Sequence, residues 1–272
     1  MIVRDNIDIY NADCITHMQS MPDNSIDLVV TSPPYDNLRT YNSDTTDWNF
    51  DTFQSVADNL FRILKDCGVI VWIVSDATIN GSETGSSFRQ ALYFNDIGLN
   101  LHDTMIWNKQ STTHPEARRY YDSFEYMFVF VKSPTGGVCD ITANLLKDRK
   151  NLWSEMPLAG TKRKADGSTK YFNKGTTFNE YGVRFNVWNQ TCARGKELTG
   201  HPAQMPIQLA VDHIKTWSNA GDIVFDPFLG SGTTAIACLE TGRRFIGCEI
   251  NQEYFELAEQ RIKDHMLVKK LF

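Results

Sequence analysis

Apolar positions along the chain follow two different periods, and their order predicts strands that alternate with helices. Apolar runs typical of buried strands lie at 26–30, 69–74, 101–107, 126–131, 222–226 and 244–250. Residues 1–14 alternate as a further strand that ends in a turn. Between the runs, apolar residues recur at helical spacing, as at Phe53, Val56, Ala57, Leu60, Phe61 and Leu64. This order predicts an α/β fold, with a mainly parallel sheet and helices on both faces.

Local signals predict where several helices begin and end. Asp51 is expected to open the helix that carries the apolar stripe, with Gln54 placed for a capping box and Gly68 at the end. Asn251 is expected to cap the closing helix. Residues 36–50 show no period, and a long loop of this kind after a candidate site is often a lid or a substrate clamp.

The regular alternation is interrupted between residues 133 and 200, where the chain is polar, basic and rich in glycine. Residues 145–200 hold eleven lysines and arginines against five acidic residues, a net charge of +6, which leaves −12 for the rest of a chain of net charge −6. We therefore expect a body formed by 1–132 and 201–272 and a smaller inserted lobe at 133–200. An acidic body with a basic insert suggests a polyanion partner. The alternative is a solvated surface loop that is rich in lysine.

Composition narrows the class of protein further. A length of 272 residues suits one large domain, or one domain with an inserted lobe. The sequence shows no secretory leader and no apolar run long enough to cross a bilayer, so we expect a cytoplasmic protein. None of the six cysteines forms a C-x-x-C pair or lies near a spaced pair of histidines. Neither a disulfide framework nor a metal site is expected.

The strand at 26–30 runs into the sequence Thr31-Ser32-Pro33-Pro34-Tyr35. Neither proline can donate to a strand ladder, and each favours extended geometry in the residue before it, so a stiff corner is expected here. The Ser32 hydroxyl, the Ser32 and Pro33 carbonyl groups and the Tyr35 ring suit the binding of a planar molecule with an exocyclic amino group. The alternative is a strand that ends in an ordinary Pro-Pro turn.

A second corner follows the strand at 222–226. Glycines at 230 and 232 let the backbone approach a ligand closely, and the helix at 235–241 presents free N–H groups at its start. The next strand carries Glu249 near its tip, where an acid is placed to bind ribose hydroxyls. A Walker-type phosphate loop is excluded, because no lysine follows the glycines. The pattern indicates a ribose-containing cofactor, and the alternative is an ordinary strand–helix corner with a surface glutamate.

The S-P-P-Y sequence at 32–35 and the D-P-F-L-G-S-G-T-T sequence at 226–234 together resemble the amino-methylating DNA methyltransferases that use S-adenosylmethionine. The S-P-P-Y sequence comes first, an order similar to the beta class of that family, whose motifs are circularly permuted. The runs at 11–14, 21–27 and 201–206 also fit. The resemblance implies a Rossmann-like methyltransferase sheet in 1–132 and 201–272, and a target-recognition lobe in 133–200.

The resemblance also implies roles for individual residues. Ser32, Pro33, Pro34 and Tyr35 would form the catalytic corner, in which Tyr35 stacks on a base rotated out of the duplex. Ser32 and the Pro33 carbonyl would accept hydrogen bonds from the amino group of that base. The residues implied to bind S-adenosylmethionine are Asp13, Cys14, Asp226, Phe228, Gly230, Ser231, Gly232, Thr233 and Glu249. Neither a metal nor a cysteine nucleophile is implied.

The corner begins with serine, where many adenine-N6 enzymes have aspartate. The serine form is commoner among cytosine-N4 enzymes, so N4 of cytosine is favoured over N6 of adenine, although some adenine enzymes carry serine too. The implied partner is double-stranded DNA, and no membrane is involved. Family members are often dimers and some accompany a restriction endonuclease. A homodimer and a cognate endonuclease are therefore further partners to consider, and the sequence identifies neither.

Two other functions stay open at this point. Methyltransferases that act on glutamine in proteins also use a Pro-Pro-Tyr corner, but they usually place the cofactor loop before that corner and lack a basic insert here. A DNA-binding protein on a catalytically inactive methyltransferase scaffold is the second alternative. The intact Ser32, Tyr35, Gly230 and Glu249 argue against loss of activity.

Overall fold

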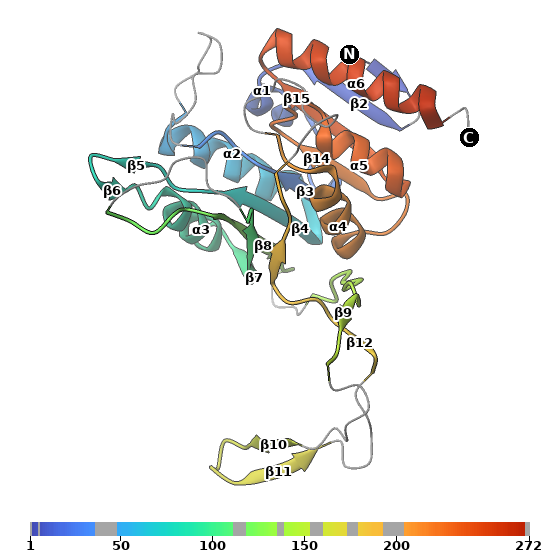
Figure 1. Ribbon diagram of the computed structural model, residues 1–272. Helices are drawn as coiled ribbons and strands as arrows, with labels where there is room; N and C mark the ends of the chain where they lie inside the picture. Colours follow the sequence, from blue (N-terminus) through green and yellow to red (C-terminus); the bar gives the residue numbers. More distant parts are fainter. Residues whose placement is uncertain are drawn as a thin grey trace. The chain divides into compact units, whose positions relative to one another are not determined.

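The computed structural model describes residues 2–4, 6–35, 48–110, 118–134, 139–152, 160–172, 179–192 and 204–269. The chain divides into two compact units, a larger one of 1–144 and 186–272 and a smaller one of 145–185 (Figure 1). The smaller unit lies within the predicted lobe of 133–200. Most of the predicted lid, 36–47, and the first part of the 201–206 run, 201–203, lie outside the described residues.

The larger unit is built on a nine-stranded sheet of order β1-β2-β15-β14-β3-β4-β8-β7-β13. Its strands are β1 (Ile2–Arg4), β2 (Ile7–Asn11), β3 (Ile26–Thr31), β4 (Leu64–Val74), β7 (Leu99–Asn108), β8 (Phe124–Lys132), β13 (Val187–Asn189), β14 (Ile223–Asp226) and β15 (Arg244–Glu249). Five neighbouring pairs of strands are parallel: β2·β15, β15·β14, β14·β3, β3·β4 and β7·β13. The prediction of a mainly parallel sheet is therefore confirmed.

One strand inside the sheet runs against the others. β8 pairs antiparallel with both β4 and β7, with Trp72 opposite Phe128 and Met105 opposite Met127. Its first residues therefore lie at the edge of the sheet where β3 and β4 end. This reversal brings side chains from the start of β8 to the same edge as the two predicted corners.

Helices cover both faces of the sheet (Figure 1). They are α1 (Cys14–Ser20), α2 (Phe50–Ile63), α3 (Ser86–Asp96), α4 (Ile207–Trp217), α5 (Thr233–Thr241) and α6 (Gln252–Lys269). The first three share one buried cluster with the sheet, whereas α4, α5 and α6 pack together on the opposite face. Among the described residues, no helix has both the length and the apolar character needed to span a membrane.

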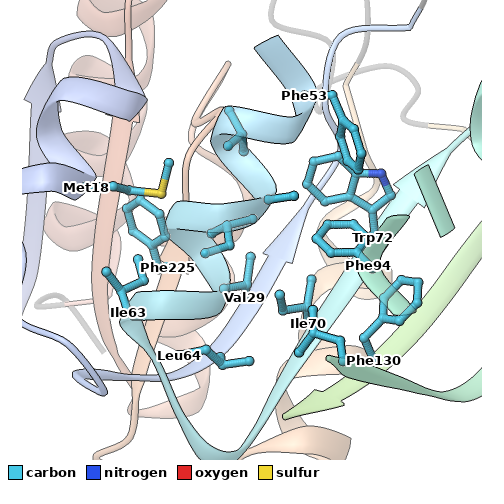
Figure 2. Packing of buried hydrophobic residues seen from close by; sticks show 14 of the residues in the cluster. Met18, Val29, Phe53, Ile63, Leu64, Ile70, Trp72, Phe94, Phe130 and Phe225 are labelled. Carbon is cyan, nitrogen blue, oxygen red and sulfur yellow. The ribbon is translucent and has the colours of Figure 1, made fainter. Parts of the chain in front are cut away.

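The main core lies between α1–α3 and the sheet, and Figure 2 shows its aromatic centre. Phe53 of α2 packs edge-on against Phe94 of α3 with ring centroids 5.3 Å apart, and Trp72 of β4 lies 5.2 Å from Phe94. The Trp72 indole N–H donates to Gln90 Oε1 at 2.8 Å, so its polar atom is satisfied inside the core. Burial of each such ring stabilises the fold by about 2–3 kcal/mol, and it fixes the strands that end at the two corners.

Two local predictions for α2 are wrong. Asn49 and not Asp51 caps the helix, because the Asn49 side chain accepts from the Thr52 N–H at 3.0 Å. Leu64 is the first residue of β4, where it pairs with Ile26, and pairing with the sheet overrides the helical spacing. The helix therefore ends at Ile63 and not at Gly68, which lies within β4, where a Cβ would come 2.8 Å from the Lys65 carbonyl oxygen.

Short two-stranded ladders make up the remaining strands. β5 (Thr78–Ile79) pairs with β6 (Ser82–Glu83) in the larger unit. In the smaller unit, β9 (Arg149–Lys150) pairs with β12 (Tyr181–Gly182), and β10 (Gly160–Arg163) pairs with β11 (Thr169–Phe172). The β10–β11 ribbon carries exposed side chains along 161–170, so within that stretch both of its faces are open to solvent.

Candidate active site

The order of the strands places a topological switch point between β14 and β3. These neighbours are parallel, with Phe225 opposite Val29, so their carboxyl ends lie side by side. The chain leaves β14 through α5 and leaves β3 towards α2, and these helices cover opposite faces of the sheet. Open α/β sheets bind their ligands at such a switch point. Both predicted corners begin here.

Asp226, the last residue of β14, connects the two corners. It is 4% exposed, and three donors surround its carboxylate. The Thr31 hydroxyl donates to Oδ1 at 2.6 Å, the Phe228 N–H donates to the same oxygen at 3.0 Å, and the Thr234 hydroxyl donates to Oδ2 at 2.7 Å. Burial raises the pKa of Asp226, and these hydrogen bonds oppose the rise. One carboxylate therefore joins β3 to the glycine loop.

The glycine loop, residues 227–232, is folded by two residues of positive φ, Gly230 at 53° and Gly232 at 80°. Gly232 is the N-cap of α5, and a Cβ there would lie 3.2 Å from the Cβ of Ala258 in α6. Glycine at 232 therefore allows both the turn and the close packing of α6. The first N–H groups of α5 lack partners within the helix, which makes its start a site for a polar ligand.

Glu249, the last residue of β15, closes the other side of the loop. Its Oε2 accepts from the Gly230 N–H at 2.8 Å and its Oε1 accepts from the Asn251 N–H at 3.0 Å. Burial raises the pKa of Glu249, and the hydrogen bonds from Asn251 and Gly230 oppose the rise. Each carboxylate oxygen has a second lone pair, so Glu249 can accept further hydrogen bonds from a ligand.

Asp13 and Cys14 lie beside Glu249, because β2 is the other neighbour of β15. The Ala12 N–H donates to the Glu249 carbonyl oxygen at 3.0 Å. Asp13 is the N-cap of α1, and its Oδ1 accepts from the Thr16 N–H at 2.8 Å. Cys14 is buried, and burial raises the pKa of its thiol to about 12, so the thiol stays protonated at neutral pH.

The proline corner carries its own hydrogen bonds. Pro33 is buried, whereas Ser32, Pro34 and Tyr35 are half-buried. The Ser32 hydroxyl lies 2.8 Å from the Tyr35 hydroxyl oxygen, and the Tyr35 hydroxyl donates to Glu125 Oε2 at 2.7 Å. Nearby, the rings of Trp48 and Phe228 meet at right angles with centroids 5.2 Å apart. The structure thus brings Ser32, Tyr35, Phe228 and Glu249 to one edge of the sheet.

Three residues that support this edge were not found from the sequence. Arg261 of α6 donates through Nη1 to the Ser231 carbonyl and hydroxyl and to the Thr233 hydroxyl, at 2.9, 3.1 and 3.1 Å. The side chains of Ser231 and Thr233, both predicted to bind the cofactor, thus hold the glycine loop to α6. Glu125 and Lys109 reach the proline corner from β8 and from the residue after β7. No local motif marks them, because their placement depends on strand pairing.

These features define the class of protein. A mainly parallel α/β sheet with a topological switch point, a glycine loop and an acid at the next strand tip is a Rossmann-like nucleotide-cofactor fold. Among the described residues, no cluster of histidine, cysteine and acidic side chains is arranged to hold a metal ion.

Comparison with known proteins gives the family. The chain matches the family described as DNA methylase, whose name covers N6 and N4 methyltransferases, over residues 26–260. The chain belongs to this family. It is 48% identical over 259 residues to the orphan methyltransferase M.BamHII of Bacillus amyloliquefaciens, covering 93% of this chain and 94% of that protein. It is 27% identical to the DNA adenine methyltransferase YhdJ of Escherichia coli K12, covering 93% and 82% of the two chains.

Solved structures share the fold. The M1.HpyAVI–SAM complex superposes with a TM-score of 0.64 at 25% identity, covering 94% of this chain and 98% of that one. The cytosine-N4-specific PvuII DNA methyltransferase superposes with a TM-score of 0.68 at 21% identity, covering 97% and 92%. The predicted Rossmann-like methyltransferase fold is confirmed.

We predict that Asp226→Ala lowers the free energy of unfolding by about 3 kcal/mol, because the Thr31 hydroxyl and the Phe228 N–H lose their acceptor and the Thr234 hydroxyl keeps only the longer contact with the Val30 carbonyl oxygen, at 3.5 Å. Asp226→Asn should cost only about 1 kcal/mol, since its oxygen still accepts two of these bonds. Urea unfolding of the two variants measures the difference. Equal losses for alanine and asparagine would show that the three hydrogen bonds do not hold the corners together.

Proposed function

We propose that this chain transfers a methyl group from S-adenosylmethionine to an exocyclic amino group of a base in double-stranded DNA. The observation that carries the proposal is the hydrogen bond between Thr31 and Asp226, because it fixes the proline corner next to the glycine loop. A group held by one corner then faces a group held by the other.

The residues at the carboxyl edge fit S-adenosylmethionine. Glu249 has spare acceptor capacity at the strand tip, where ribose hydroxyls bind in this kind of fold. Asp13, Asp226 and Glu249 make the edge acidic, which suits a ligand with a sulfonium and an ammonium group. Phe228 offers an aromatic surface, while Gly230, Ser231, Gly232 and Thr233 bring backbone groups close to the amino-acid moiety. Asp13 and Cys14 lie beside Glu249, where the adenine edge would fall.

The chemistry divides between ligand and protein. S-adenosylmethionine, when bound, would supply a methyl group activated by its sulfonium and leave as S-adenosylhomocysteine, while the methylated amino group would release one proton to solvent. Tyr35 stacks on the flipped base, and the Ser32 hydroxyl oxygen and the Pro33 carbonyl accept hydrogen bonds from its amino group. Those bonds draw the nitrogen lone pair out of conjugation with the ring and towards the methyl group. The contribution of the protein is positioning and electrostatics, and no thiolate takes part.

Cytosine N4 is our preferred target over adenine N6. The support is Ser32 at the first position of the corner, since the serine form is commoner among cytosine-N4 enzymes. The relatives include enzymes named for adenine and for cytosine, so similarity alone does not choose between the two bases.

The smaller unit suits recognition of the DNA. In the β10–β11 ribbon, Lys162 lies directly opposite Lys170, an arrangement that is unfavourable unless an anion lies between or near the two charges. Arg163 and Lys164 extend the basic surface, and all four side chains are exposed. A two-stranded ribbon fits the major groove of B-DNA. We therefore assign target recognition to the lobe at 133–200, and within it to this ribbon.

The competing functions predict different products. A protein glutamine methyltransferase would label protein, and an inactive scaffold would label nothing. A filter assay with tritium-labelled S-adenosylmethionine, plasmid DNA and protein acceptors separates the three.

Action on DNA implies a cytoplasmic location with access to the nucleoid. A homodimer stays a prediction, and so does a cognate restriction endonuclease, against which the name of the orphan relative argues.

Tyr35→Ala and Ser32→Ala should each lower the rate of methyl transfer to DNA by about a hundredfold, because the base loses its stacking surface or a hydrogen-bond acceptor. Their Kd for S-adenosylmethionine, measured by calorimetry, should stay near the wild-type value. Normal transfer by Tyr35→Ala would refute the stacking role. Long-read modification mapping of DNA from cells that express the wild-type chain identifies the methylated base.

Binding of S-adenosylmethionine should weaken as pH falls through the pKa of Glu249. The ionised carboxylate is the form that accepts from ribose hydroxyls, and its raised pKa makes the loss begin at a higher pH than for an exposed glutamate. Glu249→Gln should bind about tenfold more weakly and lose this pH dependence. Calorimetry between about pH 8 and pH 5 measures both effects. Glu256→Gln, at an exposed position, is the matched control. If Glu249→Gln kept the pH profile of the wild type, Glu249 would not be the group whose titration controls binding.

Lys170→Glu should weaken DNA binding at low salt. It should also reduce the slope of the logarithm of the binding constant against the logarithm of the salt concentration by the equivalent of about one phosphate contact or more. Lys215→Glu, the same charge change at an exposed position of α4, is the control and should have a smaller effect. Fluorescence anisotropy with a labelled duplex at several salt concentrations gives the slopes. Equal slopes for both variants would show that the β10–β11 ribbon does not contact DNA.

A further inference from the structure

A chain of hydrogen bonds runs from the proline corner to two residues outside both motifs. The Ser32 and Tyr35 hydroxyl oxygens are 2.8 Å apart, and the Tyr35 hydroxyl donates to Glu125 Oε2 at 2.7 Å. The other carboxylate oxygen, Oε1, lies 3.3 Å from Lys109 Nζ. The order of contacts is therefore Ser32, Tyr35, Glu125 and Lys109.

The reversed strand explains why Glu125 lies here. It is the second residue of β8, opposite Trp107 of β7, and it is 8% exposed. Lys109 follows β7, and its backbone N–H donates to the Ser123 carbonyl at 2.7 Å, which holds the two strand ends together. A carboxylate this buried is costly unless it is paired and hydrogen-bonded. The Lys109 ammonium and the Tyr35 hydroxyl meet that requirement, so the position of Tyr35 depends on Glu125.

The hydrogen bonds from Ser32 to Glu125 also have a direction. A carboxylate paired with an ammonium group only accepts hydrogen bonds, and a phenol has a single hydrogen to donate. That hydrogen goes to Glu125, so the hydrogen between Ser32 and Tyr35 must come from Ser32. The Ser32 hydroxyl hydrogen is thus committed to Tyr35, and the remaining lone pairs of its oxygen are left to accept.

We propose that Glu125 is a positioning residue, which acts through Tyr35 to make the Ser32 hydroxyl an acceptor towards the amino group of the target base. The inference deepens the proposed function and rests on it. Without the carboxylate, the Tyr35 hydroxyl can donate to Ser32 instead. The Ser32 hydrogen would then face the amino group, and donor would meet donor.

Glu125→Gln tests the direction, because the amide has one accepting and one donating end. Lys109 attracts the amide oxygen, so the NH₂ group faces Tyr35 and donates to its hydroxyl oxygen. This reverses the direction of the hydrogen bonds between Tyr35 and Ser32. We expect kcat for methyl transfer to fall about tenfold, with the Kd values for S-adenosylmethionine and for duplex DNA unchanged. In Glu125→Gln/Lys109→Met, the amide is free to turn its oxygen back to Tyr35, and part of kcat should return.

A double-mutant cycle with Tyr35→Phe separates positioning from a general structural effect. Phenylalanine removes the hydroxyl through which Glu125 acts, so Glu125→Gln should cost nothing further in that background. The exposed Glu256→Gln is the control for the loss of one carboxylate, and urea unfolding checks that each variant is folded. Wild-type kcat in Glu125→Gln, or an equal loss with and without the Tyr35 hydroxyl, would overturn the proposal. If the wild-type chain transfers no methyl group to DNA, the proposed function fails and this inference falls with it.

Discussion

The hydrogen bonds to Asp226 are the constraint on which the site depends. β3 and β14 are neighbours in the sheet although nearly two hundred residues separate Thr31 from Asp226, and their pairing brings both ends to one edge. Pairing alone leaves each loop free to leave that edge in its own direction. A buried carboxylate with donors on β3, in the glycine loop and on α5 removes this freedom, since each donor would be unsatisfied elsewhere.

The same edge is extended on the other side by the reversed strand β8. An all-parallel sheet would place only the carboxyl ends of strands at this edge. Because β8 runs the opposite way, its beginning lies there, and it contributes the buried Glu125 beside the proline corner. Asp226 and Glu125 thus hold the corner from two directions. Thr31 is hydrogen-bonded to Asp226, which also accepts from the glycine loop, and Tyr35 is hydrogen-bonded to Glu125 of β8.

The sequence was sufficient for the features that are local. The strand runs, the Pro-Pro corner, the glycine loop and the cap at Asn251 each depend on neighbouring residues, and the Asn251 side chain accepts from the Tyr254 N–H at 3.1 Å. Features that depend on distant partners were missed. Leu64 has helical spacing, yet pairing with Ile26 makes it a strand residue. Asn49 and Asp51 are both good caps by residue type, so the sequence does not choose between them. Arg261 and Glu125 occupy ordinary positions in α6 and β8, and the fold alone brings them to the site.

The direction of the hydrogen bonds at the proline corner bears on which atoms can react. A corner that only accepts is complementary to an amino group, which donates, and it is not complementary to a ring carbon or a carbonyl oxygen. Attack at a ring carbon commonly needs a nucleophile, and Cys14, which lies beside Glu249 at the same edge of the sheet, keeps its thiol protonated at neutral pH because burial raises its pKa to about 12. The fixed polarity from Ser32 to Glu125 therefore restricts the chemistry before any substrate binds. Cytosine N4 and adenine N6 both satisfy it, because each carries two hydrogens on a planar nitrogen. The direction of these hydrogen bonds therefore does not discriminate between the two amino groups, and our preference for cytosine N4 rests on the identity of Ser32 alone.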